Sequence, residues 1–256
     1  MEIDFSDKVV LVTGASVGIG EVTAVYFAKY GAKLVLVGRN EKNLQNVASK
    51  CEKEKGLKPL IVVADLVVDG ECAKIAKKTL DHYGKLDVLV NNAGMAYVNT
   101  IQDTDMKQYD YQFNLNVRAV YDLTRLFVNA LIESKGNIIN LSSIASTRVQ
   151  LGSVPYSMAK AAINHFTRLT ALELAPKGVR VNTISPGATV TEFVQRMLGV
   201  SDEESQVQMK NFEPNIPMGK SCESEDIAKM ILFVASDHCR LVTGTKIEVD
   251  GGINLK

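Results

Sequence analysis

Cysteine, histidine and net charge are scarce or absent in this 256-residue chain, and each scarcity excludes a class of function. The three histidines form no cluster with metal-ligand spacing, and no two cysteines form a CxxC pair. We therefore expect no metal site, and free thiols in a reducing compartment, at Cys51, Cys72, Cys222 and Cys239. Basic and acidic residues number 29 each, which does not favour nucleic acid or an acidic membrane surface as a partner.

Long apolar runs are also absent. No uninterrupted stretch approaches the roughly 20 apolar residues that a membrane-spanning helix needs. Residues 1–7 contain no basic segment followed by an apolar one, as a secretory signal would. Linkers, repeats and low-complexity tracts are lacking too, and the length suits one large α/β domain. We expect a single domain over residues 1–256 in a soluble, cytoplasmic protein that does not bind membranes.

Short apolar segments instead alternate with helical periodicity along the whole chain. Near-continuous apolar runs are typical of strands buried on both faces of a parallel sheet. The segments with strand composition are 8–12, 33–37, 60–64, 86–90, 136–141, 178–184 and 246–249. Their alternation with helices predicts a doubly wound parallel α/β sheet of about seven strands, with helices on both faces. Ligands of such sheets bind outside the carboxyl ends of the strands.

A glycine-rich loop, residues 13–20, connects the first strand to a helical pattern that stops at Gly31. Its glycines follow the spacing GxxxGxG rather than the commoner GxGxxG. Glycines let backbone amides approach a pyrophosphate, and the following helix N-terminus carries partial positive charge. Three glycines alone usually form only a turn, but the order strand, loop, helix predicts phosphate binding.

The second strand ends at Gly38-Arg39, where a dinucleotide-binding fold faces the adenosine ribose. An acidic residue there favours a free 2′-hydroxyl, whereas an arginine accommodates a 2′-phosphate. Arg39 therefore favours NADP(H) over NAD(H). The alternative is that Arg39 only opens the next helix, since no second basic residue lies in the glycine loop. Asp65, after the third strand, could accept from an adenine amino group or cap a turn.

The segment from Ser142 to Lys160 carries the clearest candidate chemistry. Pro155 suits a first helical turn, and Tyr156 and Lys160 are four residues apart on the predicted helix, hence on the same face. We expect the ammonium to stabilise the phenolate, which lowers the tyrosine pKa from about 10. Tyr156 becomes a proton donor or acceptor, and by chemistry alone either Ser142 or Ser143 could bind the reacting oxygen. Taken alone, the spacing also fits a surface pair.

The chain resembles the classical short-chain dehydrogenase/reductase family across essentially its whole length. The motifs that carry the resemblance, in order and at family spacing, are Thr13-Gly14-x-x-x-Gly18-x-Gly20, Asn91-Asn92-Ala93-Gly94, Asn116, Ser143, Tyr156-x-x-x-Lys160 and Pro186-Gly187-x-x-x-Thr191. The family spacing selects Ser143 as the catalytic serine. The resemblance implies a Rossmann-type fold with seven strands, and commonly tetramers, otherwise dimers, built through helices near 103–133 and 155–175.

The resemblance also implies a role for each matching residue. Tyr156 would act as general acid in carbonyl reduction and as base in the reverse direction, and Lys160 would lower its pKa and bind the nicotinamide ribose. Ser143 would polarise the carbonyl, and Asn116 would hold a proton relay through a helix distortion and a water. The Ile184 backbone and Thr191 would contact the carboxamide. The full set of expected cofactor contacts is Gly14, Ser16, Gly18, Ile19, Gly20, Arg39, Asp65, Asn91, Ala93, Gly94, Tyr156, Lys160, Pro186, Gly187 and Thr191.

Residues 188–217 are expected to form a substrate-binding lid. Apolar residues from 190 to 198 recur at helical spacing after the Pro-Gly turn, which predicts a short amphipathic helix. The alternative is ordinary packing or a subunit contact. The expected substrate-pocket residues are Met95, Tyr97, Val149, Leu151, Phe193 and Met197. They indicate a lipophilic carbonyl substrate such as a 3-ketoacyl thioester, a ketosteroid or a xenobiotic carbonyl compound.

Three functions stay open from the sequence. The first is reduction of a ketone or aldehyde by NADPH. The second is oxidation of an alcohol by NAD, because the same residues catalyse either direction. The third is a nucleotide-binding regulatory or scaffold protein without turnover, since a fold does not fix a function. The complete set of Asn116, Ser143, Tyr156 and Lys160 argues against the third.

Overall fold

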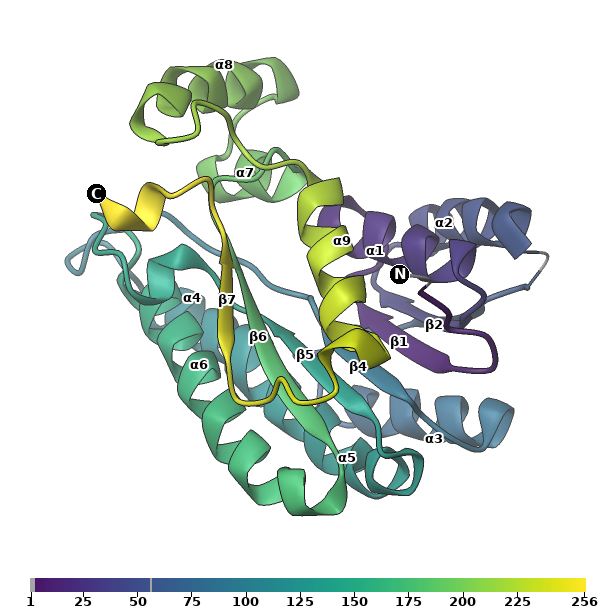
Figure 1. The fold of residues 1–256 in the computed structure, drawn as a ribbon. Coiled ribbons are helices and arrows are strands. Elements are labelled where there is room, and N and C mark those ends of the chain that lie inside the picture. Colours follow the sequence, from purple (N-terminus) through teal and green to yellow (C-terminus); the bar gives the residue numbers. More distant parts are fainter. Residues whose placement is uncertain (1–2, 56) are drawn as a thin grey trace.

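The computed structural model describes residues 3–55 and 57–256, and seven strands form one sheet in it (Figure 1). The strands are β1 (Val9–Thr13), β2 (Lys33–Gly38), β3 (Leu60–Val63), β4 (Val88–Asn91), β5 (Asn137–Leu141), β6 (Arg180–Pro186) and β7 (Lys246–Val249). Every neighbouring pair is parallel, in the order β3-β2-β1-β4-β5-β6-β7. The predicted doubly wound parallel sheet is confirmed.

Helices cover both faces of the sheet because the strands are apolar on both. All five residues of β1 are buried. One face packs against α1 (Gly18–Lys29), α2 (Glu41–Lys55) and α9 (Ser224–Ala235). The core between this face and the helices includes Phe27, Leu44 and Ile231. The other packs against α3 (Glu71–Tyr83), α5 (Ala119–Ser134) and α6 (Val154–Leu174), with Ile75, Phe127 and Leu174 in that core. Two apolar layers thus hold the strand ends in fixed positions.

The strand order reverses between β1 and β4, which is where this kind of sheet forms its ligand crevice. Thr13, the last residue of β1, connects the two strands there. Its hydroxyl accepts hydrogen bonds from the backbone amides of Asn92 and Ala93, each at 3.0 Å. Asn92 in return donates its side-chain amide to the Thr13 carbonyl at 2.8 Å. The glycine loop and the segment after β4 are therefore fixed side by side.

The helical region after β4 contains a distortion. Helix α4 (Met106–Phe113) continues into a π-helical turn, Asn114–Arg118, before α5 begins. Such a turn adds a residue to the helical repeat and is frequent at functional sites. The distortion that the family resemblance implied at Asn116 is present. Helix α6 starts with Pro155 in its first turn, as the sequence predicts.

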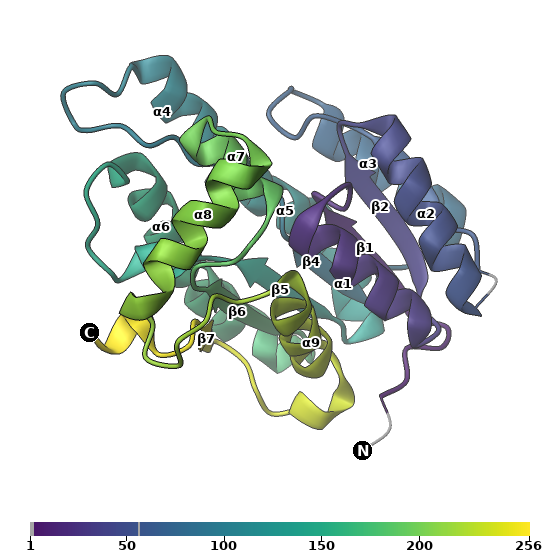
Figure 2. The same ribbon diagram turned by 90° about the horizontal axis from the view of Figure 1, so that it is seen from above.

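Residues 188–217 contain two α-helices, followed by a short 3₁₀ helix at Glu213–Asn215, rather than one helix. Helix α7 (Glu192–Leu198) matches the predicted amphipathic segment, and α8 (Asp202–Phe212) follows it. Both lie across the end of the sheet that carries the strand carboxyl termini (Figures 1 and 2). Helix α8 begins with a capping box in which the Ser201 hydroxyl and the Glu204 carboxylate satisfy each other's backbone amides. This S-x-x-E signal is visible in the sequence.

Within residues 3–55 and 57–256, no helix combines the length and the apolar character that crossing a membrane requires.

Candidate active site

A cavity of about 460 Å³ lies along the carboxyl ends of the strands, between the glycine loop and helices α7 and α8. Most of the residues that the sequence predicts for the site line this cavity, although they lie far apart in the sequence. Those that line it are Gly14, Ser16, Gly18, Ile19, Arg39, Asp65, Ala93, Gly94, Met95, Tyr97, Ser143, Leu151, Tyr156, Lys160, Pro186, Gly187, Thr191, Phe193 and Met197. The strand ends thus converge on a single elongated site.

Two glycines of the glycine-rich loop adopt backbone conformations that other residues rarely adopt. Gly14 has φ +65°, and a Cβ there would lie 2.9 Å from the Asn92 side-chain nitrogen. Gly18 has φ +60°. Val17 precedes α1, and its side chain forms no capping hydrogen bond with the first turn of the helix. The N-terminus of α1 carries partial positive charge, as the predicted pyrophosphate site requires.

The sequence predicts an adenosine at the end of the cavity beside the carboxyl end of β2. Arg39 follows β2 and donates from Nη1 to the hydroxyl of Tyr111 at 2.8 Å. The same nitrogen is 3.7 Å from the carboxylate of Asp65, which also accepts from the Val67 amide at 3.3 Å. Asp65 therefore caps the turn after β3, as one sequence interpretation expects, while it lines the cavity.

Tyr156 and Lys160 meet on one face of α6 as the spacing predicts, but their charges are not coupled as expected. The Lys160 ammonium lies over the tyrosine ring, 5.6 Å from its centroid, and donates to the Leu141 carbonyl at 2.8 Å. Burial raises the pKa of Tyr156 to about 12, and a hydrogen bond with the Ser143 hydroxyl opposes that rise. The net shift of the tyrosine pKa is therefore upward, because burial outweighs the predicted lowering by Lys160.

Lys160 is a buried cation with only 4% of its surface exposed. Burial lowers its pKa from 10.5 to about 8, because the apolar surroundings disfavour the charged form. The hydrogen bond to the Leu141 carbonyl satisfies one of its three donors. Tyr156 is therefore a neutral phenol at neutral pH, and the pKa of Lys160 lies about one unit above neutral pH.

Ser143 and Ser142 take different roles at the end of β5. The buried Ser142 donates its hydroxyl to the Lys160 carbonyl at 3.1 Å, which fixes α6 against the strand. Ser143 is half-buried and accepts from the Ala145 amide at 3.1 Å, so its hydroxyl proton is free to reach Tyr156 or a substrate oxygen. Both serines line the cavity, and Ser143 remains the one predicted to act on substrate.

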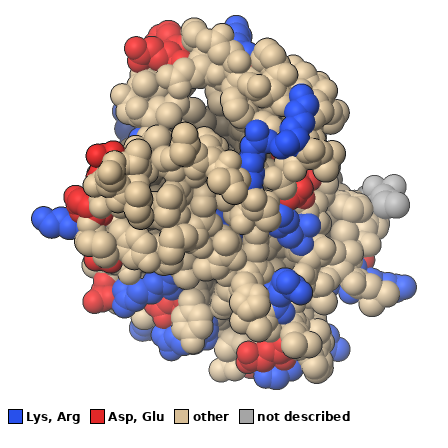
Figure 3. Space-filling model, turned by 90° about the vertical axis from the view of Figure 1, so that its left-hand side faces the viewer, with Lys and Arg blue, Asp and Glu red and all other residues tan. Residues whose placement is uncertain are grey.

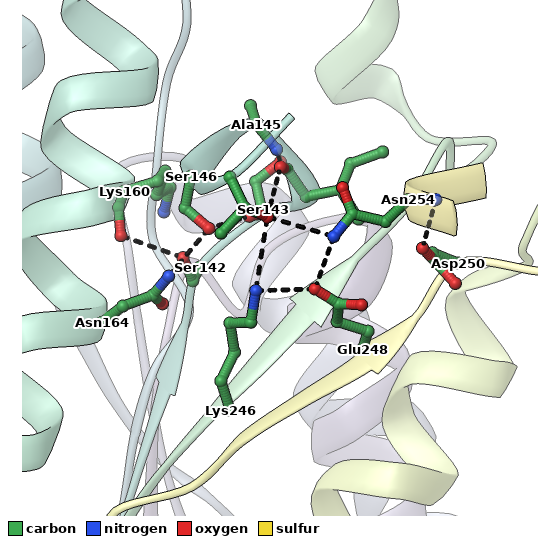
Figure 4. Close-up of polar contacts among 12 residues, drawn as sticks. Ser142, Ser143, Ala145, Ser146, Lys160, Asn164, Lys246, Glu248, Asp250 and Asn254 are labelled. Atoms are coloured by element: carbon green, nitrogen blue, oxygen red, sulfur yellow. Dashed lines mark hydrogen bonds and ion pairs between the residues drawn. The ribbon is translucent and has the colours of Figure 1, made fainter. Parts of the chain in front are cut away.

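The loop after Ser143 is held from behind by the end of the chain. Thr147 accepts hydrogen bonds from Lys246 at 3.3 Å and from Asn254 at 3.1 Å. Glu248 accepts from Asn254 at 2.7 Å and pairs with Lys246 at 2.6 Å, which closes a ring of polar contacts (Figure 4). Strand β7 and the residues after it therefore support one wall of the cavity.

Asn116 lies behind the cavity wall, where it holds the segment after β4. Its amide donates to the carbonyls of Met95 at 2.8 Å and Gln112 at 2.9 Å. Its oxygen accepts from the Met95 amide at 3.3 Å. A Cβ on Gly94 would lie 2.9 Å from that oxygen and 3.4 Å from the Lys160 nitrogen. The absence of a side chain at Gly94 therefore lets Asn116 and Lys160 lie close to the backbone after β4.

The wall opposite Tyr156 is mainly apolar. The Phe193 ring of α7 faces the Tyr156 ring, with 5.9 Å between centroids. The predicted Met95, Tyr97, Leu151 and Met197 line the cavity, although Leu151 is 96% exposed. Helix α8 adds Met209 and Phe212, which were not among the residues expected from the sequence.

Four of the predicted site residues do not line the cavity. Asn91 is buried and donates its side-chain amide to Asn140 at 2.8 Å, so it joins β4 to β5. Gly20 lies within α1, where a Cβ would come 2.2 Å from the Gly14 carbonyl oxygen. Asn116 stands behind Gly94, and Val149 is 98% exposed. Three of these residues support the site from within the protein and do not face the cavity: Gly20, Asn91 and Asn116. The periodicity of their strand or helix directs them into the protein interior.

Among the described residues, no three His, Cys, Asp or Glu side chains lie close enough to hold a metal ion. The four cysteines are free thiols, and all are buried.

Comparison with known proteins agrees with this geometry. A family model described as enoyl-(acyl carrier protein) reductase matches residues 14–254. Glucose 1-dehydrogenase of Gluconobacter oxydans is 36% identical over 253 residues, covering 98% of this chain and 93% of that protein. The chain belongs to the short-chain dehydrogenase/reductase family.

Solved structures of short-chain dehydrogenases/reductases superpose over nearly the full length. One from Caenorhabditis elegans, of unknown function and with cofactor, has a TM-score of 0.93 and 37% identity, covering 98% of this chain and 96% of that one. L-sorbose reductase of Gluconobacter frateurii, complexed with NADPH and L-sorbose, has a TM-score of 0.93 and 27% identity, covering all of both chains. A 3-ketoacyl-(acyl-carrier-protein) reductase of Brucella melitensis, complexed with NADH, has a TM-score of 0.89 and 30% identity. The match covers 98% of this chain and 100% of that one. The protein is an oxidoreductase that acts on alcohol or carbonyl groups with NAD(P).

Proposed function

We propose that this enzyme reduces a lipophilic ketone or aldehyde with NADPH. The observation that carries the proposal is the meeting of Ser143, Tyr156 and Lys160 in one cavity with the glycine loop. Burial raises the pKa of Tyr156 to about 12, so at neutral pH the phenol carries the proton that reduction of a carbonyl requires.

In the proposed mechanism the substrate carbonyl oxygen lies between the hydroxyls of Ser143 and Tyr156. Ser143 donates a hydrogen bond and polarises the carbonyl. Tyr156 gives up its hydroxyl proton as negative charge develops on that oxygen. Lys160 stabilises the resulting phenolate, and its pKa of about 8 lets it return a proton near neutral pH. Asn116 holds a route from Lys160 to water, and the nicotinamide supplies the hydride when it is bound.

The choice of NADPH rests on the end of β2. Gly38 presents no carboxylate there, and a Cβ on it would lie 3.3 Å from the Ser16 hydroxyl. Arg39 lines the cavity beside it. The nearest carboxylate, Asp65, is paired with Arg39, so its charge is partly compensated. The arrangement accommodates a 2′-phosphate better than a free ribose hydroxyl.

The substrate class rests on α7, α8 and the apolar wall. Residues 188–217 act as a lid in this proposal, with Phe193 over Tyr156 and with Met209 and Phe212 beyond it. Thr191, just before α7, would lie 3.5 Å from a Cβ at Gly18, so the lid also reaches the glycine loop. Closure over both ligands would exclude water from the reacting carbonyl.

The test is the loss of reduced-nicotinamide absorbance with NADPH and with NADH against acyl thioesters, ketosteroids, diketones, quinones and ketosugars. The proposal expects turnover of apolar carbonyls with NADPH, at least tenfold above NADH in kcat/KM. Turnover only with NADH would remove the cofactor assignment, and turnover only of ketosugars would remove the substrate class.

We also propose that the enzyme is a homo-oligomer. Apolar side chains are exposed on α5 and α6 at Tyr121, Leu169 and Leu172. Figure 3 views the side of the molecule on which α6 lies, and charged groups of both signs are mixed over its lower part. Exposed apolar patches mark protein contacts. Light scattering during gel filtration gives the mass directly, and a 27.9 kDa monomer would contradict this.

A further inference from the structure

Two polar side chains from opposite sides of the cavity meet above its adenosine end. Arg39 follows β2, and Tyr111 lies on α4, 72 residues later. Figure 2 shows the helix that follows Arg39, α2, and helix α4 on different sides of the molecule. The guanidinium nevertheless donates to the phenol at 2.8 Å, and both residues line the cavity.

Tyr111 is the fixed member of this pair. Its phenol is half-buried, and its ring lies 6.4 Å from that of Tyr97. Helix α4 is itself anchored, because Asp105 caps its first turn and Gln112 accepts from the Tyr97 amide at 3.2 Å. Arg39, by contrast, has 56% of its side chain exposed. The position of Tyr111 therefore determines where the guanidinium lies, and not the reverse.

The contact leaves the arginine able to bind an anion. Both its hydrogen bond to Tyr111 and its approach to Asp65 use Nη1. Within the described part of the chain, Nε and Nη2 form no hydrogen bond, so two parallel donors remain. Two such donors match the oxygens of a phosphate, and an arginine that is already ordered loses less freedom on binding it.

We propose that Tyr111 is a specificity-determining residue, which positions Arg39 for the 2′-phosphate of NADP(H). The inference rests on the proposed cofactor choice and adds a second residue to it. Asp65 competes with Tyr111 for the guanidinium of Arg39. If the Tyr111 hydroxyl is removed, the Asp65 carboxylate is the nearest described partner that remains for Arg39. Tyr111 keeps Arg39 directed to the ligand.

The experiment measures dissociation constants of NADPH and NADH by nicotinamide fluorescence, in the absence of substrate. Tyr111→Phe keeps the ring and its packing and removes only the hydroxyl. We expect it to weaken NADPH binding about 3- to 10-fold, as for a lost hydrogen bond, and to change NADH binding less than twofold. In an Arg39→Ala background the same substitution should change neither constant, because the partner is gone.

The matched control is Tyr109→Phe, on the same helix. The Tyr109 ring stacks on Phe113 with 4.5 Å between centroids, away from Arg39, and both constants should stay within twofold. If Arg39→Ala abolishes NADPH preference but Tyr111→Phe leaves NADPH binding unchanged or tighter, the role of Tyr111 is wrong and the cofactor assignment stands. If Arg39→Ala also changes nothing, both are wrong.

Discussion

Lys160 is a cation inside the protein, and its environment explains why the site is sensitive to protons. Only 4% of its surface is exposed, and its ammonium donates a hydrogen bond to the Leu141 carbonyl. Burial lowers its pKa to about 8, whereas the unfolded chain has the ordinary value of 10.5. Between these two values the unfolded state binds a proton that the native state has lost.

This difference predicts that the cost of burying the charged ammonium disappears as the pH rises. Stability increases wherever the unfolded state binds more protons, so the free energy of unfolding rises from about pH 8 to pH 10.5 and falls again as the pH is lowered through that range. We expect wild type to gain roughly 3 kcal/mol over Lys160→Met between these limits. Denaturant unfolding of both proteins from pH 7 to 10.5 measures the difference, and a flat difference would contradict the account.

At the scale of elements, the first turn of α1 and the glycine loop form one rigid unit. A Cβ at Gly20 would lie 2.2 Å from the Gly14 carbonyl oxygen and 2.5 Å from the Asn92 amide nitrogen. Both neighbours belong to the connection between β1 and β4. Gly20 does not line the cavity, yet it sets how closely α1 approaches the loop that binds phosphate.

Gly20→Ala should therefore weaken NADPH and NADH binding equally, by at least tenfold, because both share the pyrophosphate. Arg39→Ala is the matched comparison, since it should weaken NADPH alone. Fluorescence titration of the two cofactors measures both variants. Selective loss of NADPH in Gly20→Ala would show that the loop reads the 2′-phosphate instead.

How far the sequence predicts the site depends on whether a contact is local. Tyr156 and Lys160 are one helical turn apart, so periodicity places them together. The change in the tyrosine pKa was predicted in the wrong direction, because burial depends on how α6 packs against distant strands. Asn91 was expected at the cofactor, but strand alternation turns it toward Asn140. The contact between Arg39 and Tyr111 joins elements far apart in sequence, which no local pattern encodes.

For helices, too, the sequence predicts local features such as the first turn but not the tertiary contacts. The capping signal at Ser201 and Glu204 predicts the start of α8 once it is sought, and Glu223 with Asp226 begins α9 in the same way. Neither signal says that α8 contributes Met209 and Phe212 to the cavity.

At the scale of the whole molecule, the cavity lies between two halves of the sheet that meet at β1 and β4. One half supplies the glycine loop and Arg39, and the other supplies Ser143, Tyr156 and the lid. A dinucleotide along this cavity would contact both halves, and it could bind only the folded chain.

Cofactor binding should therefore stabilise the protein against heat. At one hundred times its dissociation constant, a ligand adds about 2.7 kcal/mol, which raises the Tm of a protein this size by roughly 5–10 °C. Differential scanning fluorimetry measures the shift, with Tyr156→Phe as a variant that should keep it. No shift at saturating cofactor would contradict a site shared by both halves.

The central claim is that Tyr156 donates the proton in carbonyl reduction, and one measurement tests it most directly. Tyr156→Phe removes the hydroxyl and keeps the ring that faces Phe193. With a carbonyl that wild type reduces, we expect kcat to fall by roughly 10²- to 10⁴-fold while the dissociation constant of NADPH stays within threefold. Near-normal turnover with intact NADPH binding would show that another group delivers the proton.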